Sequence, residues 1–186
     1  FGDPVMNPKE WDVTHMKDIC RKITDGTHHS PQTYEKGIPY VTAKHIKEGF
    51  IDFYSAPTYI SEEDHKRIYS RCDPKAGDVL YIKDGATTGI ATINRFEHEF
   101  SMLSSVALLR PSDSITAEYL MSWLNNPHIK NMILKNMGGA AIRRLTLSKI
   151  KKIPIILPPL KIQKKFTNIF NLVDISRKQI LHQRIQ

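Results

Sequence analysis

The chain has 186 residues, of which 40% are hydrophobic and 25% are charged, values that are ordinary for a globular protein. It contains no apolar run near the roughly 18 residues that a membrane span needs, and its two cysteines, Cys20 and Cys72, are too few for a disulfide framework. Composition therefore excludes a membrane-spanning chain and a disulfide-stapled domain, and it predicts reduced thiols in the cytoplasm.

The net charge of +8 is concentrated at the C-terminal end. From Arg143 onward there are eleven Lys and Arg residues and one acid, Asp174, so this stretch carries +10 and the preceding residues carry −2. A regional excess of positive charge favours a polyanionic partner.

The first part of the chain shows short periodic segments separated by turn-forming residues. In chain order, these segments predict a strand, a short helix, a loop, a second strand and a second helix: Trp11–Met16, Lys17–Ile23, Thr24–Pro31, 37–42 and 61–72. Ser61 has the character of an N-cap, and the second helix is expected to stop before Asp73-Pro74.

The middle of the chain holds the clearest strand patterns. Strands are predicted at 78–83, 89–94, 103–109 and 153–157, and helices at 116–124 and 128–137, the latter ended by Gly138-Gly139. This mixture predicts the α+β class, with a central mixed or antiparallel sheet, flanking short helices and a long C-terminal helix.

From Leu160 to Gln186 the pattern becomes that of one long helix, preceded by Pro158-Pro159. Apolar residues recur at alternating steps of four and three, with polar Ser176 between the last two: Ile162, Phe166, Ile169, Val173 and Ile180. The stripe either pairs with a second helix or packs on the chain's own domain. We expect the division to be a recognition domain over 1–157 and a pairing helix over 158–186.

Motifs for catalysis are missing from this sequence. Asp25, His28 and His29 share a loop and suggest a metal, but no ligand set with established zinc spacing is present. Gly85–Gly89 is neither a Walker A motif nor a GxGxxG motif, and a methyltransferase cofactor motif is absent. We therefore expect no catalysis, metal or cofactor in this chain.

Nucleic-acid binding has better support. Short loops that present Lys, Arg, Thr and His can reach phosphates and base edges. The candidates are His28, Lys44, His45, Lys83, Thr87, Thr88, Arg143 and Arg144. For each one alone, the alternative is a solvated surface side chain.

Four stretches in order give the chain a family resemblance. They are ITDGTHHSP (Ile23–Pro31), GIPYVTAKHIKEGFID (Gly37–Asp52), the segment Tyr59–Gly89 with its PK-GD turn and GAT-G end, and Gly138–Phe166. Together they resemble one target-recognition half of the specificity (S) subunit of type I restriction-modification enzymes. One departure is Lys161, which stands where the family usually has an acid after PPL, whereas Gln163 is kept.

The resemblance implies a DNA-recognition module that directs methylation and restriction subunits to their target. Those partners, rather than this chain, would bind S-adenosylmethionine, ATP and Mg. Two halves would pair through antiparallel helices, and the isolated chain would form a homodimer. Because the chain does not begin with Met, we expect a piece of something longer. Two alternatives stay open: the recognition domain of a fused restriction-methyltransferase polypeptide, and a protein-interaction module built around the heptad helix.

Overall fold

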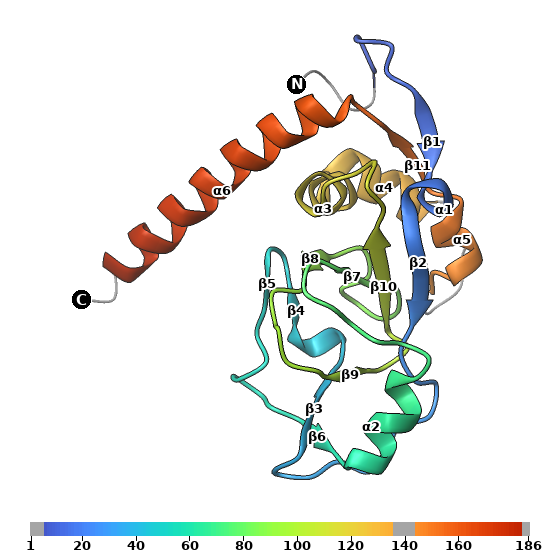
Figure 1. Cartoon of the computed structure of the whole chain (residues 1–186), viewed down its shortest axis with the longest axis vertical. Coiled ribbons are helices and arrows are strands. Elements are labelled where there is room, and N and C mark those ends of the chain that lie inside the picture. Colours follow the sequence, from blue (N-terminus) through green and yellow to red (C-terminus); the bar gives the residue numbers. More distant parts are fainter. Residues whose placement is uncertain (1–5, 136–143, 184–186) are drawn as a thin grey trace.

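The computed structural model describes residues 6–135 and 144–183, and for 174–183 it describes the backbone alone (Figure 1). Its elements, including the 3-10 helix η1, are β1 (Val13–His15), α1 (Met16–Ile19), β2 (Cys20–Asp25), β3 (Ile38–Val41), η1 (Ala43–His45), β4 (Ile46–Lys47), β5 (Phe50–Ile51), β6 (Tyr59–Ile60), α2 (Glu62–Tyr69), β7 (Val79–Ile82), β8 (Ala91–Ile93), β9 (Ser101–Met102), β10 (Val106–Pro111), α3 (Ala117–Asn125), α4 (Pro127–Lys135), α5 (Leu147–Lys151), β11 (Pro154–Ile156) and α6 (Leu160–Gln183). Runs of strands such as β7 to β10 are followed by runs of helices such as α3 to α5, which confirms the predicted α+β class.

A four-stranded antiparallel sheet in the order β2-β10-β7-β8 forms the centre of the domain (Figure 1). Alternate residues of a strand point to opposite faces. Val79 and Tyr81 of β7 therefore join the core cluster that contains α3, α4 and α5, whereas Leu80 and Ile82 join a second cluster with Val41 and neighbouring residues. Burial on both faces explains why this strand is continuously apolar instead of alternating.

Three smaller sheets complete the domain. In the order β6-β3-β9, β3 pairs antiparallel with β6 and parallel with β9, and β4 and β5 form a hairpin. Near the other end, β1 pairs antiparallel with β11, with Val13 opposite Ile156. The beginning and the end of the globular part are thus joined directly before α6 starts.

The PK-GD turn, one of the family motifs in the sequence, is joined to the central sheet by ion pairs. Arg110 of β10 donates two hydrogen bonds of 2.9 Å to the Asp78 carboxylate and one of 2.7 Å to the Asp73 carbonyl. Lys22 of β2 donates to Asp73 at 2.7 Å. Although partial burial opposes the effect, these cations hold the pKa of Asp73 below its usual value. The turn therefore ties three strands together.

One predicted helix is partly wrong, and one helix was not predicted. Of the helix predicted over Lys17–Ile23, only the part up to Ile19 is helical, because Cys20–Asp25 forms the edge strand β2 along β10. The sequence pattern predicted no element for the basic and aliphatic residues just before Ile153. They form the helix α5, which is capped by the Thr146 side chain and buries Ile150. In both places pairing or packing with distant segments outweighs the local pattern.

The base of α6 is fastened to the domain by Gln163. This side chain is almost fully buried: its Oε1 accepts from the Thr116 amide at 3.0 Å, and its Nε2 donates to the carbonyls of Ser114 and Pro158 at 3.0 and 2.8 Å. The retained Gln of the PPL junction thus has a structural role, since it satisfies backbone groups at the start of α3.

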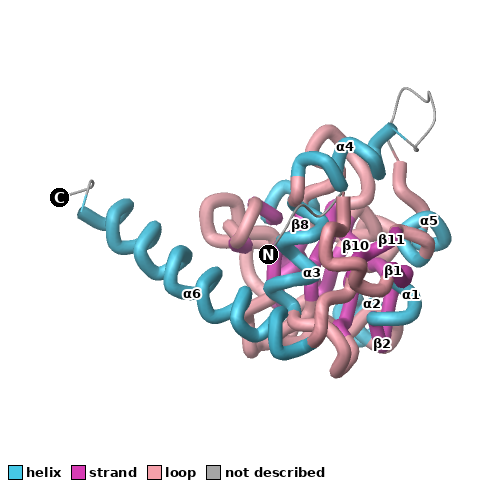
Figure 2. Tube along the Cα trace, turned by 90° about the horizontal axis from the view of Figure 1, so that it is seen from above, coloured by secondary structure: helices cyan, strands magenta, loops and turns pink. Residues whose placement is uncertain are grey.

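The first three turns of α6 pack on the domain, as far as Phe170, and the rest leaves it. The ring of Phe166 lies 5.9 Å from that of Tyr119, and Ile162 lines a cavity of about 160 Å³ between α3, α6 and the segment before β1. This corrects the expectation that the whole apolar stripe faces a second helix. Beyond this point α6 projects away from the sheet (Figures 1 and 2), and Ile169 and Val173 are about half-exposed. None of the described helices is long and apolar enough to cross a membrane.

Replacing Gln163 by Ala should destabilise the domain by about 2–3 kcal/mol, because the buried Thr116 amide and two carbonyls lose their partner. Denaturant unfolding followed by circular dichroism measures this loss. Asn168→Ala, an exposed position on the same helix, serves as the control and should change stability by less than about 0.5 kcal/mol. Equal effects at both positions would show that Gln163 does not fasten α6.

Candidate nucleic-acid interface

The ends of two central strands and the segment before α5 meet on one side of the domain. The Lys83 carbonyl, just after β7, accepts from the Leu145 amide at 2.8 Å, and Asp84 forms an isolated bridge with Arg144. Asp25 ends strand β2, which is separated from β7 by β10, and its side chain reaches Lys83. Residues far apart in sequence are therefore assembled into one site.

The loop after β2 is held close to the sheet by Gly26. A Cβ atom at this position would lie 1.9 Å from the Met102 carbonyl oxygen, so only glycine fits. The next residue, Thr27, donates its amide to the same carbonyl at 2.8 Å. Its Oγ1 also accepts from the His29 amide at 3.2 Å. The ITDGTH stretch therefore fixes the position of His28 between two anchored residues.

Five charged side chains form an alternating row across this site. In order they are Arg71, Asp25, Lys83, Asp84 and Arg144, and we call them the charged row. Arg71 donates to Asp25 Oδ1, Lys83 Nζ lies 3.4 Å from Asp25 Oδ2 and 2.9 Å from Asp84 Oδ2, and Arg144 Nε lies 3.6 Å from Asp84 Oδ1. With three cations and two anions, the row carries a net charge of +1.

Burial divides the row into an inner part and two outer ends. The side chains of Asp25 and Lys83 are each 3% exposed, whereas those of Arg71 and Arg144 are 49% and 61% exposed. His28 joins the first end, with its Nε2 3.4 Å from both Asp25 Oδ1 and Arg71 Nη2. Buried charges are tolerated because they are paired, and the exposed ends keep donors available to a ligand.

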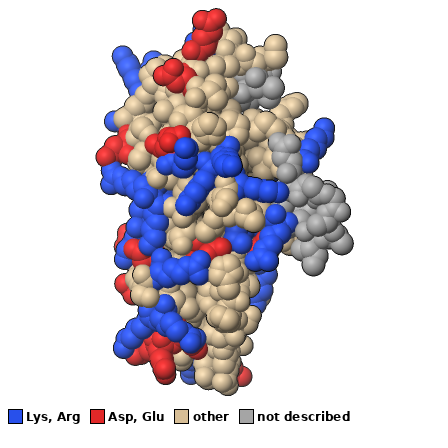
Figure 3. Space-filling view, turned by 90° about the vertical axis from the view of Figure 1, so that its right-hand side faces the viewer, with Lys and Arg blue, Asp and Glu red and all other residues tan. Residues whose placement is uncertain are grey.

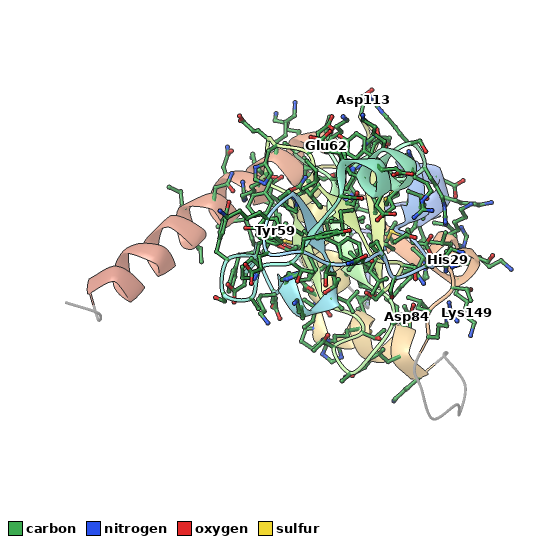
Figure 4. The ribbon with its side chains drawn as sticks, turned by 90° about the horizontal axis from the view of Figure 1, so that it is seen from below. His29, Tyr59, Glu62, Asp84, Asp113 and Lys149 are labelled. Atoms are coloured by element: carbon green, nitrogen blue, oxygen red, sulfur yellow. The ribbon has the colours of Figure 1, made fainter. Side chains whose placement is uncertain are left out.

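Basic side chains gather around this site. Figure 3 shows the right-hand side of Figure 1, where Lys and Arg lie across the middle of the face with a few acids between them. Exposed Lys149 of α5 belongs to the same side, and Figure 4 places it with His29 and Asp84, away from α6. Such a surface suits an extended anion, since donors on loops and strand ends reach phosphates.

Several predicted residues take these positions. His28 and Arg144 are exposed ends of the site, and Thr87 is exposed in the turn after Lys83. Lys44 is also exposed, but its Nζ donates to Thr58 at 2.8 Å, and no contact given for the described residues joins it to the charged row. Arg143 lies outside the described residues.

Three predicted contacts are contradicted by burial. His45 is fully buried: its Nδ1 accepts from the Thr42 amide at 3.0 Å and its Nε2 faces the Ala56 carbonyl at 2.9 Å. Burial lowers the pKa of His45 below its ordinary value. Thr88 is buried too and donates to the Gly85 carbonyl at 2.7 Å, while Lys83 is the inner cation of the row. Lys83 and Thr88 belong to the scaffold of the site, whereas His45 contacts Thr42, Ala56 and Phe53.

Arg71 is the residue that sequence reasoning missed. It follows α2, 46 positions after Asp25, and in the sequence it is one more base at the end of an amphipathic helix. No local pattern links these two residues, and only the fold brings them together. Within the described ranges, no group of His, Cys, Asp and Glu side chains is arranged to hold a metal ion.

Comparison with known proteins identifies the family. A family model described as the type I restriction modification DNA specificity domain matches residues 8–186, nearly the whole chain. The chain belongs to this family. A protein of Methanocaldococcus jannaschii, named as the MjaX type I restriction enzyme specificity subunit, is 24% identical over 182 residues, covering 93% of this chain and 42% of that protein.

Solved structures share the fold of this specificity domain. One from a study of complex assembly and conformational transition of a type I restriction-modification system has a TM-score of 0.67 at 19% identity, covering 93% of this chain and 40% of that one. The HsdS subunit from Thermoanaerobacter tengcongensis has a TM-score of 0.64 at 18% identity, covering 91% and 38%. The specificity domain thus spans about two fifths of the relatives it matches.

Replacing Gly26 by Ala should destabilise the specificity domain by about 2–3 kcal/mol, because the new Cβ would overlap a backbone carbonyl that cannot move alone. Gly49→Ala is the control: its Cβ meets nothing within 4 Å, and only its positive φ opposes the change, at a cost of about 1 kcal/mol. Thermal unfolding of both variants measures the difference. A Gly26→Ala variant as stable as Gly49→Ala would contradict the close approach.

Proposed function

We propose that this chain is a DNA target-recognition module of a type I restriction-modification system and binds duplex DNA with the face around the charged row. The observation that carries the proposal is the charged row itself, with Arg71, His28 and Arg144 exposed at its ends in a member of a DNA specificity family. Exposed Thr87, in the turn after Asp84, extends the donors available to phosphates and base edges, as does exposed Lys149, which Figure 4 places on the side of Asp84.

The chemistry of the system belongs to other subunits in this proposal. The chain directs methylation and restriction subunits to their target in the cytoplasm, and those subunits bind S-adenosylmethionine, ATP and Mg. Membership of a specificity family supports this division of labour over the two alternatives, a fused restriction-methyltransferase polypeptide and an interaction module with incidental charge. Catalysis is accordingly assigned to the partners.

The outer part of α6 serves as a pairing surface in the same proposal. Ile169 and Val173 are about half-exposed on a helix that leaves the domain (Figure 2). Full burial of each side chain would stabilise a pair by about 1.5–3 kcal/mol. A two-fold antiparallel pair of helices covers both stripes at once. The side chain of Ile180, predicted for the same surface, lies outside the described side chains.

The DNA proposal is tested by fluorescence anisotropy with a labelled duplex at salt concentrations of about 50 to 200 mM. The wild-type chain should bind with a dissociation constant of about 10⁻⁴ to 10⁻⁶ M that weakens steeply as salt rises. Arg144→Ala should weaken binding and lower the log–log salt slope by about 0.9, the value for one phosphate contact.

Arg67→Ala is the control for Arg144→Ala. Arg67 is an exposed arginine that pairs with Asp64 on α2, outside the charged row, and its loss should leave the slope unchanged. Absence of any binding by the wild-type chain at low salt would reject the proposed function.

Sedimentation at several concentrations tests the pairing of α6. The wild-type chain should form a dimer as concentration rises, and Ile169→Asp with Val173→Asp should keep it monomeric, because charge on the exposed stripe cannot be buried. As a control for folding, the double variant should have the same thermal unfolding temperature as the wild-type chain. A wild-type chain that stays monomeric at high concentration would show that this helix finds no partner in a second copy.

A further inference from the structure

The two oxygens of the Asp25 carboxylate have different partners: one contacts a buried side chain, and the other contacts side chains at the surface. Its Oδ2 faces the buried Lys83 Nζ at 3.4 Å, while its Oδ1 accepts from Arg71 and lies 3.4 Å from His28 Nε2. If this carboxylate swung toward solvent, Lys83 would keep Asp84 at 2.9 Å but lose its second anion, and the 3% exposed Asp25 would lose its buried cation, which is unfavourable. The direction of Oδ1 is therefore fixed by the core of the protein.

The two outer partners of this oxygen are fixed as well. Arg71 follows α2, and the next residue, Cys72, is 1% exposed within a core cluster and donates its amide to the Ile68 carbonyl at 3.0 Å. His28 lies between the anchored residues Thr27 and His29. Both side chains remain about half-exposed.

One edge of Arg71 is occupied and the remainder of its guanidinium stays available. A guanidinium has five N–H donors in a planar fork, and Asp25 accepts from Nη2. The fork suits the paired oxygens of a phosphate, and an arginine held in place loses less freedom on binding. His28 Nε2, 3.4 Å from Arg71 Nη2, lies beside the same donors.

We propose that Asp25 is a positioning residue of the DNA interface, which holds Arg71 and His28 so that both contact one phosphate of the DNA backbone. The proposal rests on the proposed function, because it takes the face around the charged row as the DNA-binding face. It assigns to Arg71 a phosphate contact and to the Asp25–Lys83 pair the role of orienting that contact. The anionic Asp25 thereby promotes the binding of another anion.

A positioning role for Asp25 predicts a change in DNA affinity for Asp25→Asn that is opposite to the change expected from net charge alone. Asp25→Asn makes the face more positive by one charge, which by itself strengthens the attraction of DNA. If Asp25 positions Arg71 and His28, the same substitution weakens binding, because the guanidinium loses its fixed orientation and the contact must be ordered on binding. The direction of the change in affinity separates the two explanations.

The matched control is the pair Asp64 and Arg67 on α2. Asp64 also accepts from an arginine, and its side chain is 21% exposed, against 3% for that of Asp25. Asp64→Asn adds the same charge outside the proposed phosphate site, so affinity should stay equal or rise slightly.

The experiment measures binding of the full chain to a labelled duplex over a salt series for Asp25→Asn, Asp64→Asn, Arg71→Ala, Arg71→Lys and Arg67→Ala. We expect Asp25→Asn and Arg71→Ala each to weaken binding roughly tenfold, and Arg71→Ala to lower the salt slope by about 0.9. Arg71→Lys should restore the slope but only part of the affinity, because an ammonium lacks the fork. Arg67→Ala should match the wild type.

Two outcomes overturn the proposal while leaving DNA binding by the wild-type chain intact. One is tighter binding by a folded Asp25→Asn variant, which would make Asp25 a plain negative charge on the face. The other is an Arg71→Ala variant with the affinity and slope of the wild type. The second test stands even if Asp25→Asn does not fold, because Arg71 is half-exposed and Asp25 keeps Lys83 as a partner.

Discussion

A carboxylate and an ammonium group, Asp25 and Lys83, lie inside this domain with their side chains 3% exposed and 3.4 Å between Oδ2 and Nζ. Neither ion is stable there alone, since an unpaired buried charge costs several kcal/mol. The end of β2 must therefore stay within side-chain reach of the end of β7, across β10, and Asp84 must stay near Lys83 to complete the neutralisation. The shape of the charged face follows from this requirement.

The residues of the family motifs have distinct structural roles around the Asp25–Lys83 pair. Gly26 allows the loop after β2 to touch the Met102 carbonyl, the PK-GD turn binds Arg110 and Lys22, and Gln163 fastens α6 to α3. These residues build and orient the scaffold. The side chains that remain exposed at the ends of the row keep donors available to a ligand.

The sequence was most informative where the local pattern and the tertiary contacts agree. The strand over Val79–Ile82, the helix capped by Ser61 and the long helix from Leu160 are present because apolar spacing and capping residues determine them locally. Strand β2 and helix α5 were not predicted, because β2 exists through pairing with β10 and α5 through packing on the core. Arg71 and the burial of His45, Lys83 and Thr88 depend on contacts between distant segments, which no short motif encodes.

Hydrogen–deuterium exchange of the full chain with and without duplex DNA tests most directly that the face around the charged row binds DNA. Backbone amides of residues 26–29, 84–89 and 145–146 should exchange more slowly with DNA, because they lie at or beside the exposed ends of the row. Those of the β4–β5 hairpin, on the other side of the central sheet in Figure 1, should not change. Protection confined to the hairpin or to α6, with the charged face unchanged, would contradict the account.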